Sequence, residues 1–551
     1  MTDRTDTVGS TGSTGGAGNQ GTYLMGIDFG TESCRVSVCD VEGRPLALAA
    51  TGYPTSHPRP GWAEQDPEDW WNALQASTHR ALDSAGISAS QIAGISYDAT
   101  TLTLVAMDRR GQVLRPAIMW MDVRATEQAA RAQASDSVAR LYNGGGSSPA
   151  VAEWYPFKAA WLKENEPQTY IQAAHVVDAV DWATYKLTGE WTTSISSAAL
   201  RMYYNRSYGG WPEDFYETIG CADVLAKVPE RVLDLGVPVG PLATVPAQLL
   251  GLRPGIPVAQ GPADAWAGQI GLGVLSPGSM ALITGSSHVL TGQSATEIHG
   301  PGFFGAYTDA VVPGQYTVEG GQVSTGSVLK WFKDGFASDL TSAAEKVGLN
   351  PYTVLDAQAA KIRPGSDGLI INDYFQGNRT PYSDSKARGI VAGLSLMHTP
   401  AHFYRAIEES VCYGTAHNLQ VMAEAGFQVR RIVACGGATK SRDWMQMHAD
   451  VTGVPIAVTE VGDAVALGAC VVAAVGAGLY QDLGEAAASM VREIDVFEPR
   501  SEPHEEYRFY LERYRELFPG SRTPSTRWLT VRPCAREGSS QGKKEPERNR
   551  R

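Results

Sequence analysis

The sequence predicts an α/β fold made of two similar halves that flank a central cleft. The segment Tyr23–Arg35, YLMGIDFGTESCR, has an apolar run, an acidic residue, a turn of small residues and a return run. The segment Ser279–Thr291, SMALITGSSHVLT, repeats this design. Apolar runs bounded by turn residues indicate a strand–turn–strand hairpin. Because each hairpin opens a long stretch of alternating strands and helices, the chain has the pattern of an internal duplication.

The first half continues with a helix expected over 68–85, followed by strands over 92–97 and 101–107. From about residue 126 to 256 the sequence is more helical, more irregular and rich in Trp and Tyr. Core packing is the default explanation for these aromatic residues, and a ligand pocket is the alternative.

The second half opens near residue 257 with a strand, a turn and a helix expected over 265–270. After the second hairpin, residues 431–441 predict a strand–turn–helix unit. A strand at 456–458 then precedes a helix expected over 464–476.

The two hairpins together are suited to hold a polyphosphate. Glycine lets the backbone approach a ligand closely, and successive N–H groups form an anion site. Asp28, at the end of the first strand, would then face a Mg²⁺ ion on that polyphosphate. The alternative is that each hairpin is only a hairpin, since glycine-rich turns are common.

The composition indicates a globular protein with ample core material: 551 residues, 43% hydrophobic and 19% charged. A formal net charge of −13 argues against a nucleic-acid partner and against an anionic membrane surface. No apolar run approaches the roughly 20 residues that span a bilayer. The seven scattered cysteines form no CxxC pair, which favours reduced core thiols and a cytoplasmic location. Residues 1–21 and 533–551 are expected to be disordered tails. Nucleic-acid binding by the second tail is a weaker alternative.

Several motifs in order make the chain resemble the FGGY carbohydrate kinases, from about Tyr23 to Phe518. They are DFGTESCR (28–35), GWAEQDPEDWW (61–71), YDATT (97–101), MWMDVRA (119–125), GPADAWAG (261–268), TGSSH (284–288), EGGQ (319–322) and CGGATKS (435–441). The resemblance implies a duplicated, actin-like ATPase fold (ribonuclease H-like), with an N-terminal sugar-binding domain over 22–262 and a C-terminal ATP-binding domain over 263–520. It also implies transfer of the γ-phosphoryl group of ATP to a sugar or polyol hydroxyl.

Within that family, these motifs and YFQGNRTP (374–381) look most like ribulokinase-type pentulose kinases. A kinase for ribulose is therefore expected, with xylulose and pentitol kinases as alternatives. A switch ATPase of the actin-like class is disfavoured by the sugar-side motifs, and an inactive sugar sensor by the retained Asp28 and Asp264. A homodimer is expected only because members of the family often form one.

The resemblance implies that Asp264 is the catalytic base, in contact with both the sugar and the metal ion. Judged from the residues alone, Asp264 is equally suited to cap the helix that follows it. Asp28 is expected to hold Mg²⁺ through water. The residues expected to contact phosphates are Gly30, Thr31, Ser33, Thr284, Gly285 and Ser286, while Gly436 and Gly437 are expected to line the adenosine pocket.

On the sugar side, the expected contacts are Asp98, Ala99, Trp120, Arg201 and Glu319. Trp120 would pack against the carbon skeleton, although a buried Trp is more often part of the core. Arg201 stands where ribulokinase-like relatives often have Lys. The planar guanidinium of Arg does not bind a ligand in the same way as the compact ammonium group of Lys. Arg35 is either a phosphate contact or a structural ion-pair partner.

Overall fold

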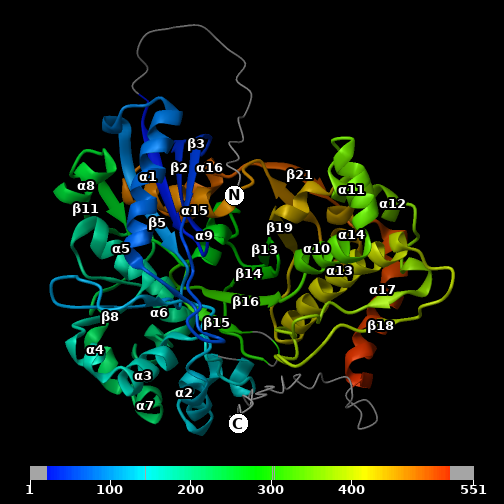
Figure 1. Ribbon diagram of the computed structural model, residues 1–551, viewed down its shortest axis with the longest axis horizontal. Helices are drawn as coiled ribbons and strands as arrows, with labels where there is room; N and C mark the ends of the chain where they lie inside the picture. The colour runs from blue at the N-terminus through cyan, green and yellow to red at the C-terminus, as the bar shows by residue number, and fades with distance from the viewer. Residues whose placement is uncertain (1–20, 143, 301, 303, 522–551) are drawn as a thin grey trace, which may run out of the picture.

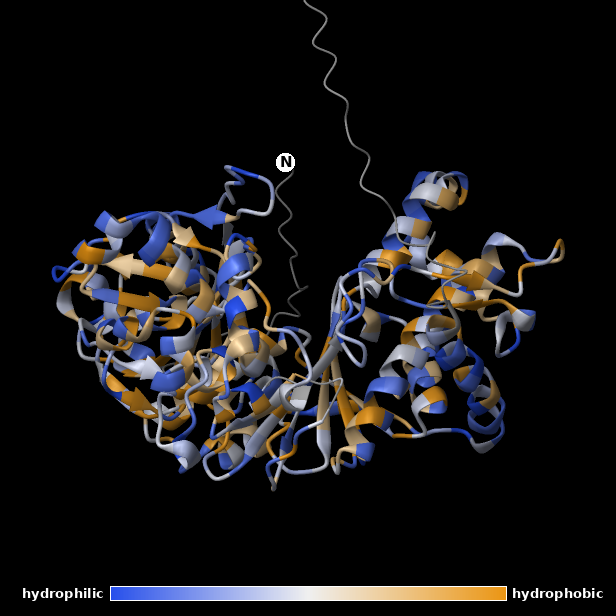
Figure 2. Ribbon diagram, turned by 90° about the horizontal axis from the view of Figure 1, so that it is seen from below, coloured by the Kyte–Doolittle hydropathy of each residue, from blue (hydrophilic) through white to orange (hydrophobic). Residues whose placement is uncertain are grey.

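The computed structural model describes residues 21–521 apart from 143, 301 and 303. Of the expected tails, residues 1–20 and all of 533–551 lie outside the described residues. The chain forms two α/β halves side by side, each built on its own mixed sheet (Figure 1). Apolar residues concentrate on the strands inside both halves (Figure 2). No helix in the described part is long and apolar enough to cross a membrane.

The first sheet has the order β11-β12-β5-β1-β2-β3. Strand β1 runs antiparallel to β2 and parallel to β5, as the first predicted hairpin requires. The strands are β1 (Tyr23–Phe29), β2 (Ser33–Asp40), β3 (Pro45–Gly52), β5 (Ile92–Ala99), β11 (Pro238–Pro241) and β12 (Pro257–Ala259).

One face of this sheet packs against helices α1 (Pro67–Ala85) and α5 (Ala179–Thr188). Helix α1 begins where Asp66 accepts a hydrogen bond from the Glu68 N–H, and ends at Gly86 with φ +63°. Both are standard helix-capping arrangements. The predicted helix over 68–85 is therefore confirmed to within one residue.

The opposite face of the first sheet is covered by a helix from the second half. Helix α15 (Ala464–Gly476), drawn in orange, lies beside the blue strands of the first half in Figure 1. A Cβ atom added to Gly26 of β1 would lie 2.7 Å from the carbonyl oxygen of Ala466, and one on Gly94 of β5 2.6 Å from that of Ala473. The two glycines let α15 pack closely, so the two halves are interlocked.

The second sheet has the order β15-β16-β14-β13-β19-β20-β21. Strands β13 and β14 form the second hairpin that the sequence predicts, and β19 runs parallel to β13. The strands are β13 (Ser279–Thr284), β14 (His288–Ser294), β15 (Gly305–Thr308), β16 (Tyr316–Gln322), β19 (Arg431–Gly436), β20 (Ile456–Thr459) and β21 (Glu493–Phe497). The helices of this half are α9 (Asp264–Gly271), α10 (Gly326–Phe336), α11 (Ser338–Lys346), α12 (Pro351–Ala359), α13 (Pro400–Glu424), α14 (Arg442–Thr452), α16 (Leu483–Met490) and α17 (Ser501–Ser521).

A lobe inserted in the first half contains a small sheet of order β4-β7-β6-β8. The strand expected over 101–107 begins only at Leu104, because Leu102 has φ +66° and turns the chain. Most of the lobe's aromatic residues are buried in its core. The elements of the lobe are β4 (Glu64–Gln65), β6 (Leu104–Met107), β7 (Ala117–Ile118), β8 (His175–Asp178), α2 (Thr126–Arg131), α3 (Tyr155–Asn165), α4 (Pro167–Gln172) and α7 (Glu213–Thr218). Of the other helices, α6 (Ile195–Arg201) packs in one core cluster with α9 and α15, and α8 (Thr244–Leu250) packs against α1 and α5.

Candidate active site

The first hairpin places three charged side chains side by side. Asp28, near the end of β1, lies opposite Arg35 on β2 and opposite Asp98 on β5. Arg35 forms ion pairs with Asp28 and with Asp463, the residue that caps α15. Arg35 is therefore a structural ion-pair partner that joins the two halves.

Asp28 and Asp98 are both buried; Asp28 is paired with Arg35, and within the described part of the chain neither carboxylate oxygen of Asp98 accepts a hydrogen bond. Burial raises the pKa of Asp28 to about 7; Arg35 opposes this rise, and the charges of Asp463 and Asp264 add to it. Burial, Asp28 and Asp264 raise the pKa of Asp98 well above its ordinary value. Buried carboxylates without donors attract a cation.

Asp264 is the first residue of α9, and Ala263 occupies the capping position before it. Its Oδ1 atom accepts a hydrogen bond of 2.7 Å from the Ala265 N–H. Removal from water raises the pKa of Asp264 to about 6, while Ala265 and Arg35 oppose the rise. Asp28 lies opposite Asp98, and Ala99 is bridged to Ala263, so the three carboxylates stand at neighbouring positions of one site.

The donor set fits a Mg²⁺ ion bound to a nucleotide. Mg²⁺ usually takes one or two carboxylates and fills its other positions with water and phosphate oxygens. The carboxylate of Asp28 and the unpartnered oxygens of Asp98 could supply such ligands. Among the described residues no group of three or more His, Cys, Asp or Glu side chains has the geometry of an all-protein metal site. The arrangement therefore suits an ion shared with a ligand.

The turn of the first hairpin is held from several sides. The Gly30 N–H donates to the Ser33 carbonyl at 3.1 Å, and the Tyr53 hydroxyl donates to the Gly30 carbonyl. The indole Nε1–H of Trp120 donates to Thr31 Oγ1 at 3.0 Å. Trp120 is half-buried and packs at the edges of two core clusters, so it links the sugar-side motif to the hairpin.

The second hairpin is tied to the loop that carries Gly436 and Gly437. Thr284 Oγ1 donates to the Cys435 carbonyl at 2.7 Å and accepts from the Ala438 N–H at 3.1 Å. A side chain on Gly436, whose φ is +94°, would collide with the Thr284 backbone, whereas Gly437 has open space around it. The hydroxyl of Thr284 therefore fixes the loop.

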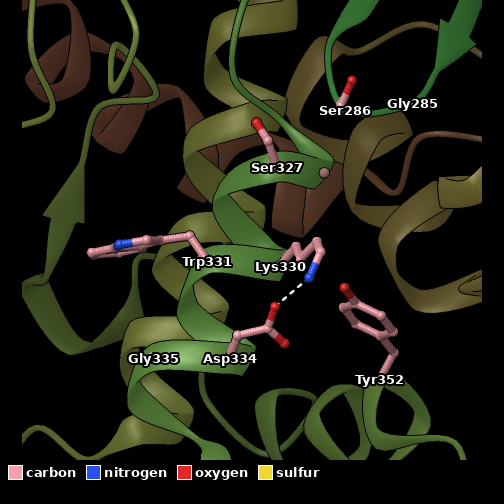
Figure 3. Close-up of a pocket in the computed structure, with 9 residues that line it drawn as sticks. Gly285, Ser286, Ser327, Lys330, Trp331, Asp334, Gly335 and Tyr352 are labelled. Atoms are coloured by element: carbon pink, nitrogen blue, oxygen red, sulfur yellow. Dashed lines mark hydrogen bonds and ion pairs between the residues drawn. The ribbon is translucent and has the colours of Figure 1, made fainter. Parts of the chain in front are cut away.

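Beside this hairpin lies a pocket of about 720 Å³ at the start of α10 (Figure 3). The N–H groups of Thr325 and Ser327 donate to the Ser286 carbonyl at 3.0 and 3.2 Å, which docks α10 on the turn. Lys330 turns toward Asp334, with which it forms an ion pair, and Tyr352 lies next to them. The lining residues are Gly285, Ser286, Gly326, Ser327, Lys330, Trp331, Asp334, Gly335 and Tyr352.

Of the residues that line this pocket, only Gly285 and Ser286 are predicted from the sequence. The signal available for the others was the run Ser324-Thr-Gly-Ser327, which follows a strand and opens a helix. Helix starts of this kind often bind anions, but here the N–H groups of Thr325 and Ser327 already donate to the Ser286 carbonyl.

On the sugar side, Arg201 and Glu319 form an ion pair with each other. Arg201 ends α6 in the first half, and Glu319 lies on β16 in the second. The Tyr307 hydroxyl lies 3.0 Å from both an Arg201 nitrogen and a Glu319 oxygen. Ala99 is bridged to Ala263, directly before Asp264. The expected sugar contacts therefore fall into two groups. Asp98 and Ala99 lie beside Asp28 and Asp264, with Trp120 bonded to the first hairpin. Arg201 and Glu319 lie at the boundary between the halves.

Two interlocked α/β halves with paired hairpins define the class of two-domain, actin-like ATPase folds, as the sequence predicts. The N-terminal domain of the FGGY family of carbohydrate kinases matches residues 23–271, and its C-terminal domain matches residues 280–477. The chain belongs to the FGGY family of carbohydrate kinases, and it is a phosphotransferase that uses ATP and acts on a sugar hydroxyl.

The relatives of this chain include proteins named for different sugar substrates. A ribulokinase of Shouchella clausii is 32% identical, with 90% of this chain and 94% of the relative covered. A Xenopus laevis FGGY carbohydrate kinase domain-containing protein is 31% identical, with 90% and 95% covered. The chain is also similar to the crystal structure of xylulose kinase from Rhodospirillum rubrum, with a TM-score of 0.80 and 29% sequence identity. The match covers 91% of this chain and 99% of that one.

Proposed function

We propose that this enzyme transfers the γ-phosphoryl group of ATP to a hydroxyl of a pentulose, with ribulose as the first candidate and Asp264 as the general base. The observation that carries the proposal is the position of Asp264. It shares a site with the carboxylates of Asp28 and Asp98, and the charge of Glu319 on the sugar side also raises its pKa. A base at this point meets a metal-bound phosphate on one side and a hydroxyl on the other.

Phosphoryl transfer depends mainly on positioning and charge neutralisation. Asp28 and Asp264 would hold Mg²⁺, which neutralises charge on the phosphates, and the donor-free oxygens of Asp98 support a cation there. The turn residues Gly30, Thr31 and Ser33 would contact phosphates from the first half. Gly285 and Ser286 would do so from the second, beside the start of α10. The 720 Å³ pocket next to them suits the adenosine moiety. Gly437 is not among its lining residues, but the space around it leaves room for a ligand to extend to the loop after β19.

A neutral sugar suits the other side of the site. Arg201 and Glu319 neutralise each other, so a hydroxyl can donate to the carboxylate and accept from the guanidinium without burying net charge. Trp120 offers an aromatic edge to the carbon skeleton, and Asp98 and Ala99 offer acceptors at the strand end. The ribulokinase relatives favour ribulose, and the similarity to a xylulose kinase structure makes xylulose the second candidate.

The test is ATP consumption in the presence of Mg²⁺ with D- and L-ribulose, D- and L-xylulose, ribitol, arabitol, xylitol, gluconate and glycerol. The proposal expects kcat/KM for one pentulose to exceed that for every polyol and for the anionic gluconate. Preference for a polyol or for gluconate would overturn the pentulose assignment. ATP hydrolysis that no sugar stimulates would favour a switch ATPase instead.

A further inference from the structure

Lys158 on α3 is a fully buried lysine beneath the sugar side of the first half. Its Nζ donates to the carbonyl oxygens of Leu102 at 2.8 Å, Met119 at 2.6 Å and Trp120 at 3.2 Å. An ammonium group has three N–H donors, and each of them has a backbone acceptor here. The side chain thus ties two separate segments of the chain together.

The first of these segments is a strained turn. Leu102 has φ +66°, a left-handed conformation that is unfavourable for a residue other than glycine. Its N–H donates to the buried Asp178 Oδ2 at 2.6 Å, while its carbonyl accepts from Lys158. The Ala179 N–H also donates to the Thr103 carbonyl at 3.0 Å. Two buried ionisable side chains therefore hold Leu102, one through its N–H and the other through its carbonyl.

Both segments lead directly to the expected sugar contacts. The turn follows Asp98 and Ala99 at the end of β5, and the second segment carries Trp120. We propose that Lys158 and Asp178 form a positioning clamp that sets the sugar-facing turn and Trp120, so that sugar affinity depends on the charge of Lys158. This inference rests on the proposed function, because it assigns these residues to the sugar side of the site.

The electrostatic surroundings make the clamp sensitive to pH. Burial lowers the pKa of Lys158 to about 7; the nearby Asp122, Glu153 and Asp178 favour the charged form, and Arg124 opposes it. Above that pH the amine is neutral and keeps only two N–H donors for three carbonyl groups. Sugar affinity is therefore expected to fall as the pH rises from 7 to 9.

The experiment compares Lys158→Met with Lys163→Met. Lys163 lies on the same helix but is exposed, and its Nζ also donates to a backbone carbonyl, that of Gly220 at 2.9 Å. The clamp predicts that Lys158→Met raises KM for the preferred sugar about tenfold, since buried acceptors are left unpaired. KM for MgATP should rise less than the sugar KM, because the pocket proposed for adenosine lies in the other half. Lys163→Met should change neither value.

The wild-type enzyme provides a second readout that needs no variant to fold. Its sugar KM should rise between pH 7 and 9, and the rise should vanish in Lys158→Met. An unchanged sugar KM in that variant, or a flat wild-type profile, would overturn the clamp alone. If the wild type phosphorylates no sugar at any pH, the proposed function itself fails, and the clamp fails with it.

Discussion

Arg201 and Glu319 join the two halves of the molecule through one buried ion pair. Their side chains are only 12% and 17% exposed, and the Arg201 guanidinium also lies over the Phe304 ring at 4.6 Å. Both residues were expected as separate sugar contacts, and the structure brings them together. Since they come from opposite halves, the pair both shapes the sugar side and fixes how the halves meet.

Removing one partner of this pair leaves the other charge buried and unpaired. We expect Arg201→Met or Glu319→Gln alone to lower the free energy of unfolding by about 3–5 kcal/mol. The double variant should lose less than the sum of the two, because neither charge remains unpaired. Urea unfolding of the four proteins measures this coupling.

The exposed pair Arg431–Glu493, with side chains 42% and 34% exposed, provides the control. Its removal should change the unfolding free energy by about 1 kcal/mol at most. Strictly additive effects of the Arg201 and Glu319 substitutions would contradict the buried-pair account.

Two glycines on α10 differ in how much space a side chain would have beside the pocket proposed for the nucleotide. A Cβ atom on Gly326 would collide with the Gly285 carbonyl, whereas one on Gly335 would meet nothing within 4 Å. Both residues line the same pocket. We expect Gly326→Ala to push the second hairpin away from the helix and raise the Kd for ADP about tenfold or more.

Gly335→Ala should lower ADP affinity less than Gly326→Ala does, and should stabilise the helix by about 0.5–1 kcal/mol. Calorimetric titration with ADP measures both affinities. Equal loss of affinity in both variants, or none in Gly326→Ala, would show that the hairpin–helix contact does not shape the nucleotide site.

The local elements were predictable because their signals are local. The hairpins around Asp28 and Gly285 and the helix over 464–476 follow from apolar periodicity and turn residues, and the structure confirms them. The packing of α15 on the first half was not predictable, because it depends on two glycines that meet a segment about 380 to 440 residues away. The burial of Lys158 was not predicted either, although a single lysine within the apolar run Tyr155–Leu162 indicates a buried charge.

A buried histidine predicts how stability responds to acid. His448 on α14 lies within hydrogen-bond distance of the Trp444 carbonyl through Nδ1, at 2.9 Å, and burial lowers its pKa to about 4. Between pH 7 and 5 the unfolded chain takes up a proton at this residue, whose ordinary pKa is about 6.5, while the native state does not. The residue therefore removes about 2 kcal/mol of stability over that interval.

Urea unfolding of wild type and His448→Gln at pH 7 and pH 5 tests this expectation. The stability lost on acidification should be about 2 kcal/mol smaller in the variant. His57→Gln, at an exposed residue, should leave the loss as in the wild type. An identical loss in His448→Gln and the wild type would refute the linkage.

The most direct test of the central claim is sugar-stimulated ATP turnover by the wild type and by Asp264→Asn, measured together with ADP binding. The account predicts that the wild type consumes ATP when the preferred pentulose is present. It also predicts that Asp264→Asn loses at least about 10²-fold in kcat, because the amide cannot accept the hydroxyl proton, and still binds ADP. Turnover by Asp264→Asn at a rate near that of the wild type would contradict the assignment of Asp264 as the base.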